Sequence, residues 1–373
     1  MTNHHRIFYP FAFLLILFPL FGSAQVISEE PKDLFIVGSE SITIKSEINA
    51  KEYKLYVNLP EKYATDSTKV YPVFYTLDGH GSFGYTTSIY NSIRFDAFVP
   101  EMIIVGITYG GEKPDYNSLR NQDLTPSAVV DRDSSGGAPK FLRVLDDELI
   151  PMIDSIYRTD KTNRTLAGTS YGGLFAHYVL FNQPSLFNGY VINNPSFGWD
   201  NDYSYKLEEE YYRNNKSLNA KVIFFTGEYD NGKTNTTRMS EQMKRHQYTN
   251  LNLDFREVEN MGHLGGETEA LSQGMRFIYK RPTILLPEDE LKEYCGTYQV
   301  RNYMLEIVIR DGELTLIHKS GPEGVKIQAI SKSEFAVSKK YLDFHFNRNK
   351  EGKVISFFHQ RNHWNSGTAV KIK

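Results

Sequence analysis

Residues 165–173 read Thr-Leu-Ala-Gly-Thr-Ser-Tyr-Gly-Gly, and an apolar, helix-like stretch follows at residues 174–181. A short strand that ends in Gly-x-Ser-x-Gly and leads into a helix is the sequence context of a nucleophile elbow. The serine, Ser170, must adopt a strained backbone conformation there, and we expect side chains at Gly168 or Gly172 to collide across the turn. The five-residue pattern alone is weak, because chance would produce it in about one chain of this length in eight.

Strand-like and helix-like runs alternate from the region of residue 36 to residue 279. The apolar runs typical of strands are residues 53–59, 73–77, 102–107, 165–167, 221–226 and 253–258. Leucine and isoleucine residues at three- and four-residue spacing over residues 142–156 predict an amphipathic helix, which Pro151 should kink or restart, and residues 239–246 predict another helix. This alternation predicts an α/β fold built on a doubly wound, mostly parallel sheet.

The pattern changes after Pro287, where the helical period is lost. Short segments of alternating polarity follow, separated by turn signals such as Asp311-Gly312 and Glu351-Gly352. These segments are residues 293–300, 304–310, 313–318, 325–330, 334–337, 341–347 and 354–360. They predict a small C-terminal antiparallel all-β domain at residues 288–373, after a catalytic domain at residues 25–282. The residues of this second domain do not indicate its role.

The first 24 residues have a weakly basic start, an apolar stretch at residues 7–21 and small residues at 22–24. This order predicts a signal peptide at residues 1–24 that is cleaved after Ala24. The apolar stretch is interrupted by Pro10 and Pro19 and falls short of the roughly 20 residues that span a bilayer. We therefore expect a secreted or periplasmic protein without stable membrane insertion after cleavage.

Composition excludes several classes of partner and cofactor. The net charge is -3, and no basic stripe interleaved with aromatic residues is present, so we expect no nucleic-acid partner. His359 and His363 have no nearby cysteines or carboxylates at metal-ligand spacing, and the chain contains neither a dinucleotide fingerprint nor a phosphate-binding loop. The sequence therefore predicts that the protein uses no metal and no other cofactor.

Two later loops offer the partners that a reactive serine requires. A serine becomes a nucleophile when a histidine removes its proton and a carboxylate orients that histidine. The strand at residues 222–226 runs into Gly-Glu-Tyr-Asp, and the strand at residues 253–258 runs into a glycine-flanked loop that contains His263. We predict His263 as the base and Asp230 as the acid, with Glu228 as the alternative acid.

The negative oxygen of an acyl-transfer intermediate needs hydrogen-bond donors. One predicted donor is the backbone N–H of Tyr171, directly after the serine. We expect the second in the glycine-rich loop after residues 73–77, at the backbone N–H of His80, with Gly79 as the neighbouring alternative. A plain glycine-rich turn is the other interpretation of this segment.

Taken together, these segments resemble the esterase D type branch of the α/β-hydrolases, which includes siderophore, feruloyl and acetyl xylan esterases. The resemblance covers residues from about 50 to 280 and rests on residues 72–79, 104–107, Arg120 with 123–126, Gly137 with 141–142 and 148–151, 168–175, 194–200 and 262–263. It is nearest to the siderophore-esterase-like subgroup, which often has histidine at the place of Thr169 and tryptophan at the place of Gly198.

The resemblance implies Ser170 as nucleophile, His263 as base and an acid within residues 228–230, although some members rely mainly on serine and histidine. We expect a secreted serine carboxylic-ester hydrolase that forms an acyl-enzyme. Its substrates would be acetyl or feruloyl esters of carbohydrates or siderophore-type lactone esters, either small molecules or polysaccharides. An acyltransferase to a sugar acceptor and a non-catalytic binding protein on the same scaffold remain as alternatives.

Overall fold

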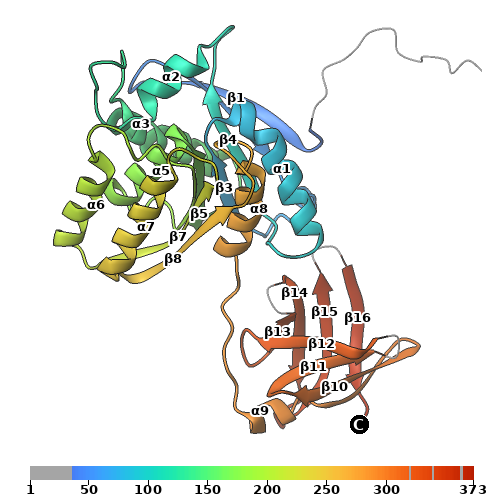
Figure 1. The fold of residues 1–373 in the computed structure, drawn as a ribbon. Helices are drawn as coiled ribbons and strands as arrows, with labels where there is room; N and C mark the ends of the chain where they lie inside the picture. The colour runs from blue at the N-terminus through green and yellow to red at the C-terminus, as the bar shows by residue number, and fades with distance from the viewer. Residues whose placement is uncertain (1–35, 319–320, 338–339, 362–363) are drawn as a thin grey trace, which may run out of the picture. The chain divides into compact units, whose positions relative to one another are not determined.

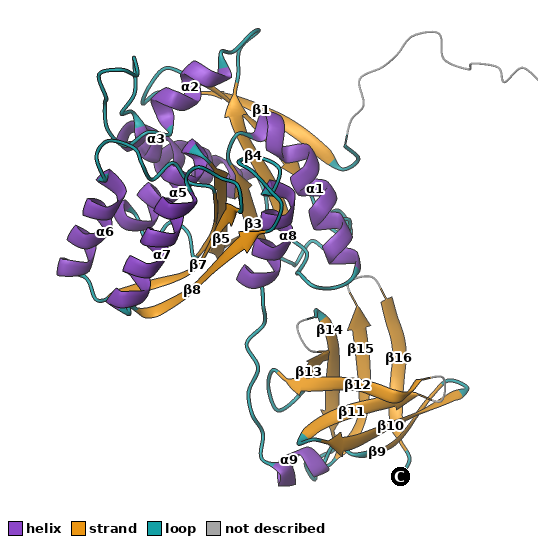
Figure 2. Cartoon of the chain, viewed as in Figure 1, coloured by secondary structure: helices purple, strands orange, loops and turns teal. Residues whose placement is uncertain are grey.

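The computed structural model describes residues 36–318, 321–337, 340–361 and 364–373. The predicted signal peptide, with its cleavage after Ala24, lies outside the described residues. Two sheets organise the described chain: an eight-stranded sheet with helices on both faces, and a closed barrel of antiparallel strands (Figure 1, Figure 2). The predicted combination of a mostly parallel α/β sheet and a C-terminal all-β part is therefore confirmed.

The first sheet has the strand order β1-β2-β4-β3-β5-β6-β7-β8. Strand β2 pairs antiparallel with both β1 and β4, and every other neighbouring pair in the sheet is parallel. The strands are β1 (Ser39–Lys45), β2 (Glu52–Asn58), β3 (Tyr71–Thr76), β4 (Ile103–Tyr109), β5 (Thr159–Thr169), β6 (Gly189–Asn193), β7 (Ser217–Gly227) and β8 (Thr249–Val258). Strands β4 and β6 are buried at every position, as expected for parallel strands covered on both faces.

Helices cover both faces of this sheet. Helices α1 (Gly79–Phe95) and α8 (Glu267–Ile278) lie together on one face, and helices α3, α5, α6 and α7 lie on the opposite face (Figure 1). The remaining bounds are α2 (Tyr116–Asp123), α3 (Ala138–Val144), α4 (Ile150–Ile156), α5 (Tyr171–Asn182), α6 (Tyr203–Asn214), α7 (Lys233–His246) and α9 (Glu288–Lys292). Helix α5 is buried along almost its whole length and fixes the elbow that precedes it.

The predicted disturbance at Pro151 is present. A π-helical turn, Leu145–Leu149, joins α3 to α4 directly before this proline. Proline has no N–H to donate and its ring clashes with the carbonyl four residues earlier, so the wider π turn allows the helix to continue past it.

The second sheet closes as a barrel in the order β10-β11-β12-β13-β14-β15-β16-β9. Its strands are β9 (Gly296–Val300), β10 (Tyr303–Arg310), β11 (Glu313–His318), β12 (Gly321–Ala329), β13 (Glu334–Val337), β14 (Leu342–Arg348), β15 (Val354–Arg361) and β16 (Trp364–Lys371). Tyr294, Tyr298, Phe335, Phe346 and Phe357 pack against one another in its core. Closure removes exposed strand edges, and in a barrel of this size side chains fill the interior.

Three strands escaped the sequence analysis. Strands β1 and β16 have few apolar residues in alternation, and β16 contains an Asn-Ser-Gly interruption. Strand β6 is only five residues long and begins with a glycine. Its strand character comes from its place between β5 and β7, which is a tertiary effect that local preference does not reveal.

A buried histidine, His177, lies in α5 among aromatic side chains. The His177 ring is 4.8 Å, centroid to centroid, from the rings of both Phe181 and Phe197. Among the described residues neither ring nitrogen of His177 has a hydrogen-bond partner. Burial lowers the pKa of His177 to about 3, so the imidazole is neutral in the folded protein.

The low pKa of His177 predicts that the folded protein becomes less stable as the pH falls. Below pH 6.5 the unfolded chain binds a proton on His177 that the folded chain does not bind until near pH 3, so the free energy of unfolding falls as pH decreases through this window. The contribution lost between pH 7 and pH 5 is about 2 kcal/mol. In His177→Leu, urea unfolding followed by circular dichroism should show a pH 7 to pH 5 loss smaller by about this amount. An unchanged loss would contradict a neutral buried imidazole.

Candidate active site

Five neighbouring parallel strands, β3, β5, β6, β7 and β8, end at one edge of the sheet. Residues that follow their carboxyl ends are therefore brought close together, which is where open α/β sheets carry their ligand sites. The residues of interest after these five strands are, in order, Asp78, Ser170, Asn194, Asp230 and His263.

The elbow has the backbone strain that its sequence predicts. Ser170 has φ 61 and ψ -117, in a region that side-chain-bearing residues rarely adopt. A Cβ atom at Gly168 would lie 2.4 Å from the carbonyl group of Gly172, so Gly168 is required. The same prediction for Gly172 is wrong, because a Cβ there would make only ordinary contacts, 3.4 Å or longer, with Asp78 and Leu77. The turn is tight at Gly168 because the backbone of Gly172 approaches it closely.

Ser170 and His263 line the same open cavity, which has a volume of about 510 Å³. The Ser170 hydroxyl lies 3.3 Å from the Ser196 hydroxyl, and among the described residues no hydrogen bond joins it to His263. Hydrogen bonds of this kind commonly tighten when substrate binds. The His263 side chain is 48% exposed, so its free nitrogen is accessible from the cavity.

His263 is held by a buried carboxylate. Its Nδ1 atom lies 2.5 Å from Oδ2 of Asp230, whose side chain is only 3% exposed. The other oxygen of Asp230 accepts the backbone N–H of Gly232 at 2.7 Å. This contact fixes the ring orientation and leaves Nε2 as the nitrogen that can exchange a proton with a hydroxyl.

Glu228, the alternative acid, has a different contact. Its carboxylate accepts the backbone N–H of Asn260 at 2.8 Å, at the start of the loop that carries His263. The two loops also approach closely at Gly227, where a Cβ atom would lie 2.4 Å from the carbonyl oxygen of Gly262. Asp230 therefore contacts the imidazole, whereas Glu228 supports the backbone that presents it.

Asn194 links three of the loops, a role that the sequence analysis did not assign. Its amide nitrogen donates to the carbonyl oxygen of His263 at 2.6 Å, and its amide oxygen accepts the N–H of Gly227 at 2.9 Å. Asn194 is buried and follows β6, the strand that the sequence analysis missed. The Asn-Pro pair at residues 194–195 was the available signal, because it marks the end of an element.

The segment at residues 78–81 is the first turn of α1, which corrects the prediction of a glycine-rich loop. Asp78 precedes the helix in the left-handed conformation, with φ 53. A Cβ atom at Gly79 would lie 2.7 Å from the carbonyl carbon of Gly106, so only glycine fits this approach to β4. Backbone N–H groups in the first turn of a helix have no acceptor within the helix, so those of Gly79 and His80 keep their donor capacity.

The His80 side chain is fixed against neighbouring elements. Its ring stacks on Tyr116 at 3.8 Å between centroids, and its Nδ1 atom lies 3.1 Å from the Thr108 hydroxyl. Burial lowers the pKa of His80, and the nearby charge of Asp78 opposes this effect. His80 also lines the Ser170 cavity.

Two further acidic groups line this cavity. Asp78 accepts two hydrogen bonds from the guanidinium of Arg120, at 3.0 and 2.9 Å. Glu267 begins α8, and burial raises its pKa, while hydrogen bonds with Tyr85 and Thr169 partly oppose that shift. The sequence analysis missed Glu267 because its only local signal, an acid at the start of a helix, is common.

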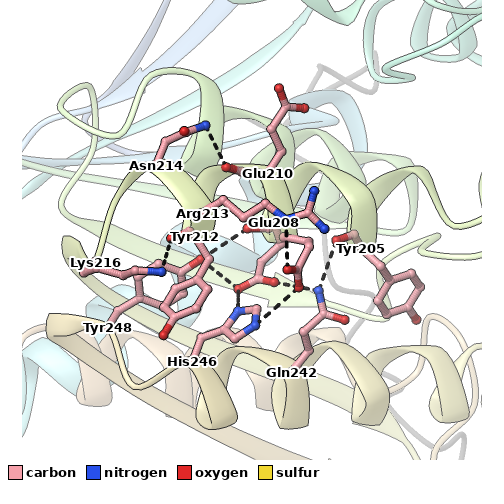
Figure 3. Close-up of polar contacts among 11 residues, drawn as sticks. Tyr205, Glu208, Glu210, Tyr212, Arg213, Asn214, Lys216, Gln242, His246 and Tyr248 are labelled. Carbon is pink, nitrogen blue, oxygen red and sulfur yellow. Dashed lines mark hydrogen bonds and ion pairs between the residues drawn. The ribbon is translucent and has the colours of Figure 1, made fainter.

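Two groups of potential metal ligands occur among the described residues: Glu208, Glu209 and His246, and Glu334, Asp343 and His345. In the first, Glu208 is buried and its carboxylate already accepts hydrogen bonds from Gln242 at 2.6 Å and Tyr248 at 2.8 Å, and contacts His246 at 2.8 Å (Figure 3). In the second, Arg281 forms ion pairs with two of the three ligands. These contacts explain both groups as structural networks, and the absence of a metal remains a prediction.

Comparison with known proteins identifies the family. Residues 46–261 match the family model described as "Putative esterase". "Ferri-bacillibactin esterase BesA" of Bacillus subtilis (strain 168) is 27% identical over 267 residues, which cover 65% of this chain and 90% of the relative. "Siderophore triacetylfusarinine C esterase" of Aspergillus fumigatus is 27% identical over 177 residues, which cover 46% of this chain and 60% of the relative.

A solved structure agrees with these sequence matches. The crystal structure of the BES protein from Bacillus cereus is 30% identical to this chain and has a TM-score of 0.61. The match covers 67% of this chain and 98% of that protein. Among the described residues, no helix is both long and apolar enough to cross a membrane. The matches show a carboxylic ester hydrolase, and the chain belongs to the family described as "Putative esterase".

Proposed function

We propose that this protein is a serine esterase that acts through an acyl-enzyme, with Ser170 as nucleophile, His263 as base and Asp230 as acid. The observation that carries the proposal is the contact between His263 and the buried Asp230, in a loop that shares a cavity with the strained Ser170. A hydroxyl, an imidazole and a carboxylate in this order are the parts that nucleophilic serine catalysis needs.

The reaction follows from these positions. Ser170 Oγ attacks the ester carbonyl carbon while His263 Nε2 takes the hydroxyl proton, and the Asp230 carboxylate stabilises the imidazolium that forms. The tetrahedral intermediate then collapses, the bond to the alcohol oxygen breaks, and His263 returns the proton to that alcohol. Water attacks the acyl-enzyme with His263 again as base, which releases the acid and regenerates Ser170.

Two helix N-termini support the proposed oxyanion site. Tyr171 is the first residue of α5 and His80 is the second residue of α1, so both backbone N–H groups belong to first turns. Such groups are unpaired within the helix and lie at the positive end of its dipole. We assign the two donors to Tyr171 and His80, with Gly79 as the alternative to His80.

The substrate that we propose is a siderophore-type lactone ester. One relative is named as a bacillibactin esterase and another as a siderophore esterase. A second open cavity of about 460 Å³ adjoins the first, and Tyr171, Ser196 and Trp199 are among its lining residues. Because Ser170 is 3.3 Å from Ser196, a branched substrate could place groups in both cavities while its ester lies at the nucleophile.

We also propose that the protein is exported, with residues 1–24 as a cleaved signal peptide and a secreted or periplasmic mature enzyme. Within this proposal residues 25–282 form the catalytic domain and residues 288–373 form an appended barrel domain. The apolar stretch at residues 7–21 and the change of pattern after Pro287 support it.

Replacing the nucleophile tests the proposal directly. Ser170→Ala should lower turnover of p-nitrophenyl acetate and of an iron-free tricatechol trilactone at least about a thousandfold. It should also abolish labelling by a fluorophosphonate, because no alkoxide remains to attack phosphorus. The matched control is Ser88→Ala, an exposed serine of α1. Labelling of Ser170→Ala, or turnover within about tenfold of the control, would contradict the mechanism.

A pair of isosteric substitutions tests the acid. Asp230→Asn should lower kcat about 10²–10⁴-fold with little change in KM, because an amide cannot stabilise the imidazolium. Glu228→Gln should change kcat less than about tenfold, since its amide oxygen can still accept the N–H of Asn260. The reverse ranking in steady-state kinetics would assign the acid to Glu228.

A further inference from the structure

The charged side chains that line the Ser170 cavity are two carboxylates, one guanidinium and two histidines: Asp78, Glu267, Arg120, His80 and His263. Burial lowers the pKa of His80, which favours the neutral ring. His263 contacts the buried carboxylate of Asp230 directly behind it. With histidine counted as neutral, two carboxylates and one guanidinium give these groups a negative formal charge.

The single guanidinium of this cavity, that of Arg120, already forms an ion pair within the protein. Arg120 binds both oxygens of Asp78, at 3.0 and 2.9 Å, in a fork-to-fork ion pair. It also lies over the ring of Tyr171, 5.2 Å from the centroid. A substrate anion that bound Arg120 would have to compete with a carboxylate held in this geometry.

Glu267 is the carboxylate of this cavity without a direct ion pair to lysine or arginine among the described residues. Burial raises its pKa, while the charge of Arg120 and hydrogen bonds with the neutral Tyr85 and Thr169 oppose that rise and favour the ionised form. Glu267 is the first residue of α8, so its carboxylate already matches the positive end of that helix. Thr169 is the residue next to Ser170, which brings this charge close to the reacting centre.

The adjoining cavity continues the same pattern. Its charged lining residues are Asp131, Arg132 and Asp200, again with more carboxylates than cations. Proteins that bind phosphate or other multiply charged anions gather arginine and lysine at the site, because opposite charge both attracts and orients the ligand. Neither cavity next to Ser170 has such a gathering among its lining residues.

We propose that Glu267 makes this site select the uncharged form of its ester substrate and discriminate against polyanionic forms. Combined with the proposed function, on which this step rests, the preferred substrate is the iron-free tricatechol lactone. Free catechols keep their protons at neutral pH, whereas three catecholates around ferric iron lose six protons and give a trianion. The B. subtilis relative is named for a ferric substrate, so this chain differs from it in the form that it hydrolyses.

The first experiment compares the two forms of one ligand. kcat/KM is measured at pH 7 for an iron-free tricatechol trilactone and for its ferric and gallium complexes. The iron-free form should be favoured at least about tenfold, and the two metal complexes should behave alike because they carry the same charge. Equal or faster hydrolysis of the complexes overturns the inference.

A second pair of substrates separates this inference from the proposed function. p-Nitrophenyl butyrate and p-nitrophenyl hemisuccinate have acyl chains of similar size, but only the second carries a carboxylate. The ratio of kcat/KM for the anionic to the neutral ester should be low in the wild-type protein and rise as salt screens the cavity. If neither lactone form is hydrolysed, the siderophore proposal fails. The ratio for the two p-nitrophenyl esters still shows whether the site discriminates against anionic substrates.

The residue is tested by an isosteric change. Glu267→Gln keeps a group that can hydrogen-bond with Tyr85 and Thr169, and it should raise the anionic-to-neutral ratio about tenfold. The control is Glu269→Gln, an exposed position on the same helix, which should leave the ratio unchanged. If Glu267→Gln does not fold, the salt dependence of the wild-type ratio stands as the test. A ratio that responds neither to the substitution nor to salt overturns the inference.

Discussion

Parallel pairing of the central strands is the constraint on which the site depends. At the carboxyl edge Thr169 is opposite Asn193, which is opposite Phe225, and Gly227 is opposite Val258. This register places the last residues of β5 and β6 level with each other, and those of β7 and β8 level with each other slightly beyond them, so the loops that follow start close together. A slip of one residue in any pair would turn its side chains to the other face and separate the loops.

The strain at Ser170 persists because its surroundings determine its position. The Ser170 N–H donates to the carbonyl oxygen of Asn193 at 3.1 Å, and the Ser170 carbonyl accepts from Leu174 at 2.9 Å and Ser196 at 3.2 Å. A backbone conformation of this kind costs on the order of 1–3 kcal/mol. These hydrogen bonds and the burial of α5 offset that cost, and Ser170 at the edge of the sheet still lines the open cavity.

The parts of the site that sequence could predict are those that a short motif encodes. Ser170, Asp230 and His263 each follow an apolar strand and lie near glycines that permit close approaches, and the structure brings Asp230 to His263. The role of Asn194 was hidden because its partners, Phe225 and Gly227 in β7 and His263 in the loop after β8, are distant from it in the sequence. The start of α1 was taken for a loop because two glycines have low helix propensity, which tertiary packing overrides.

A negatively charged cavity and the stabilisation of an oxyanion are compatible, because the two effects act over different distances. An acyl transfer creates one transient negative charge, and the proposed donors to it are backbone N–H groups of α1 and α5, whose effect is confined to the first helical turn. The ionised carboxylate that we propose for Glu267 acts over a longer distance, especially where burial reduces solvent screening. Under the two proposals the site stabilises an oxyanion at one point while it disfavours a substrate that is anionic throughout.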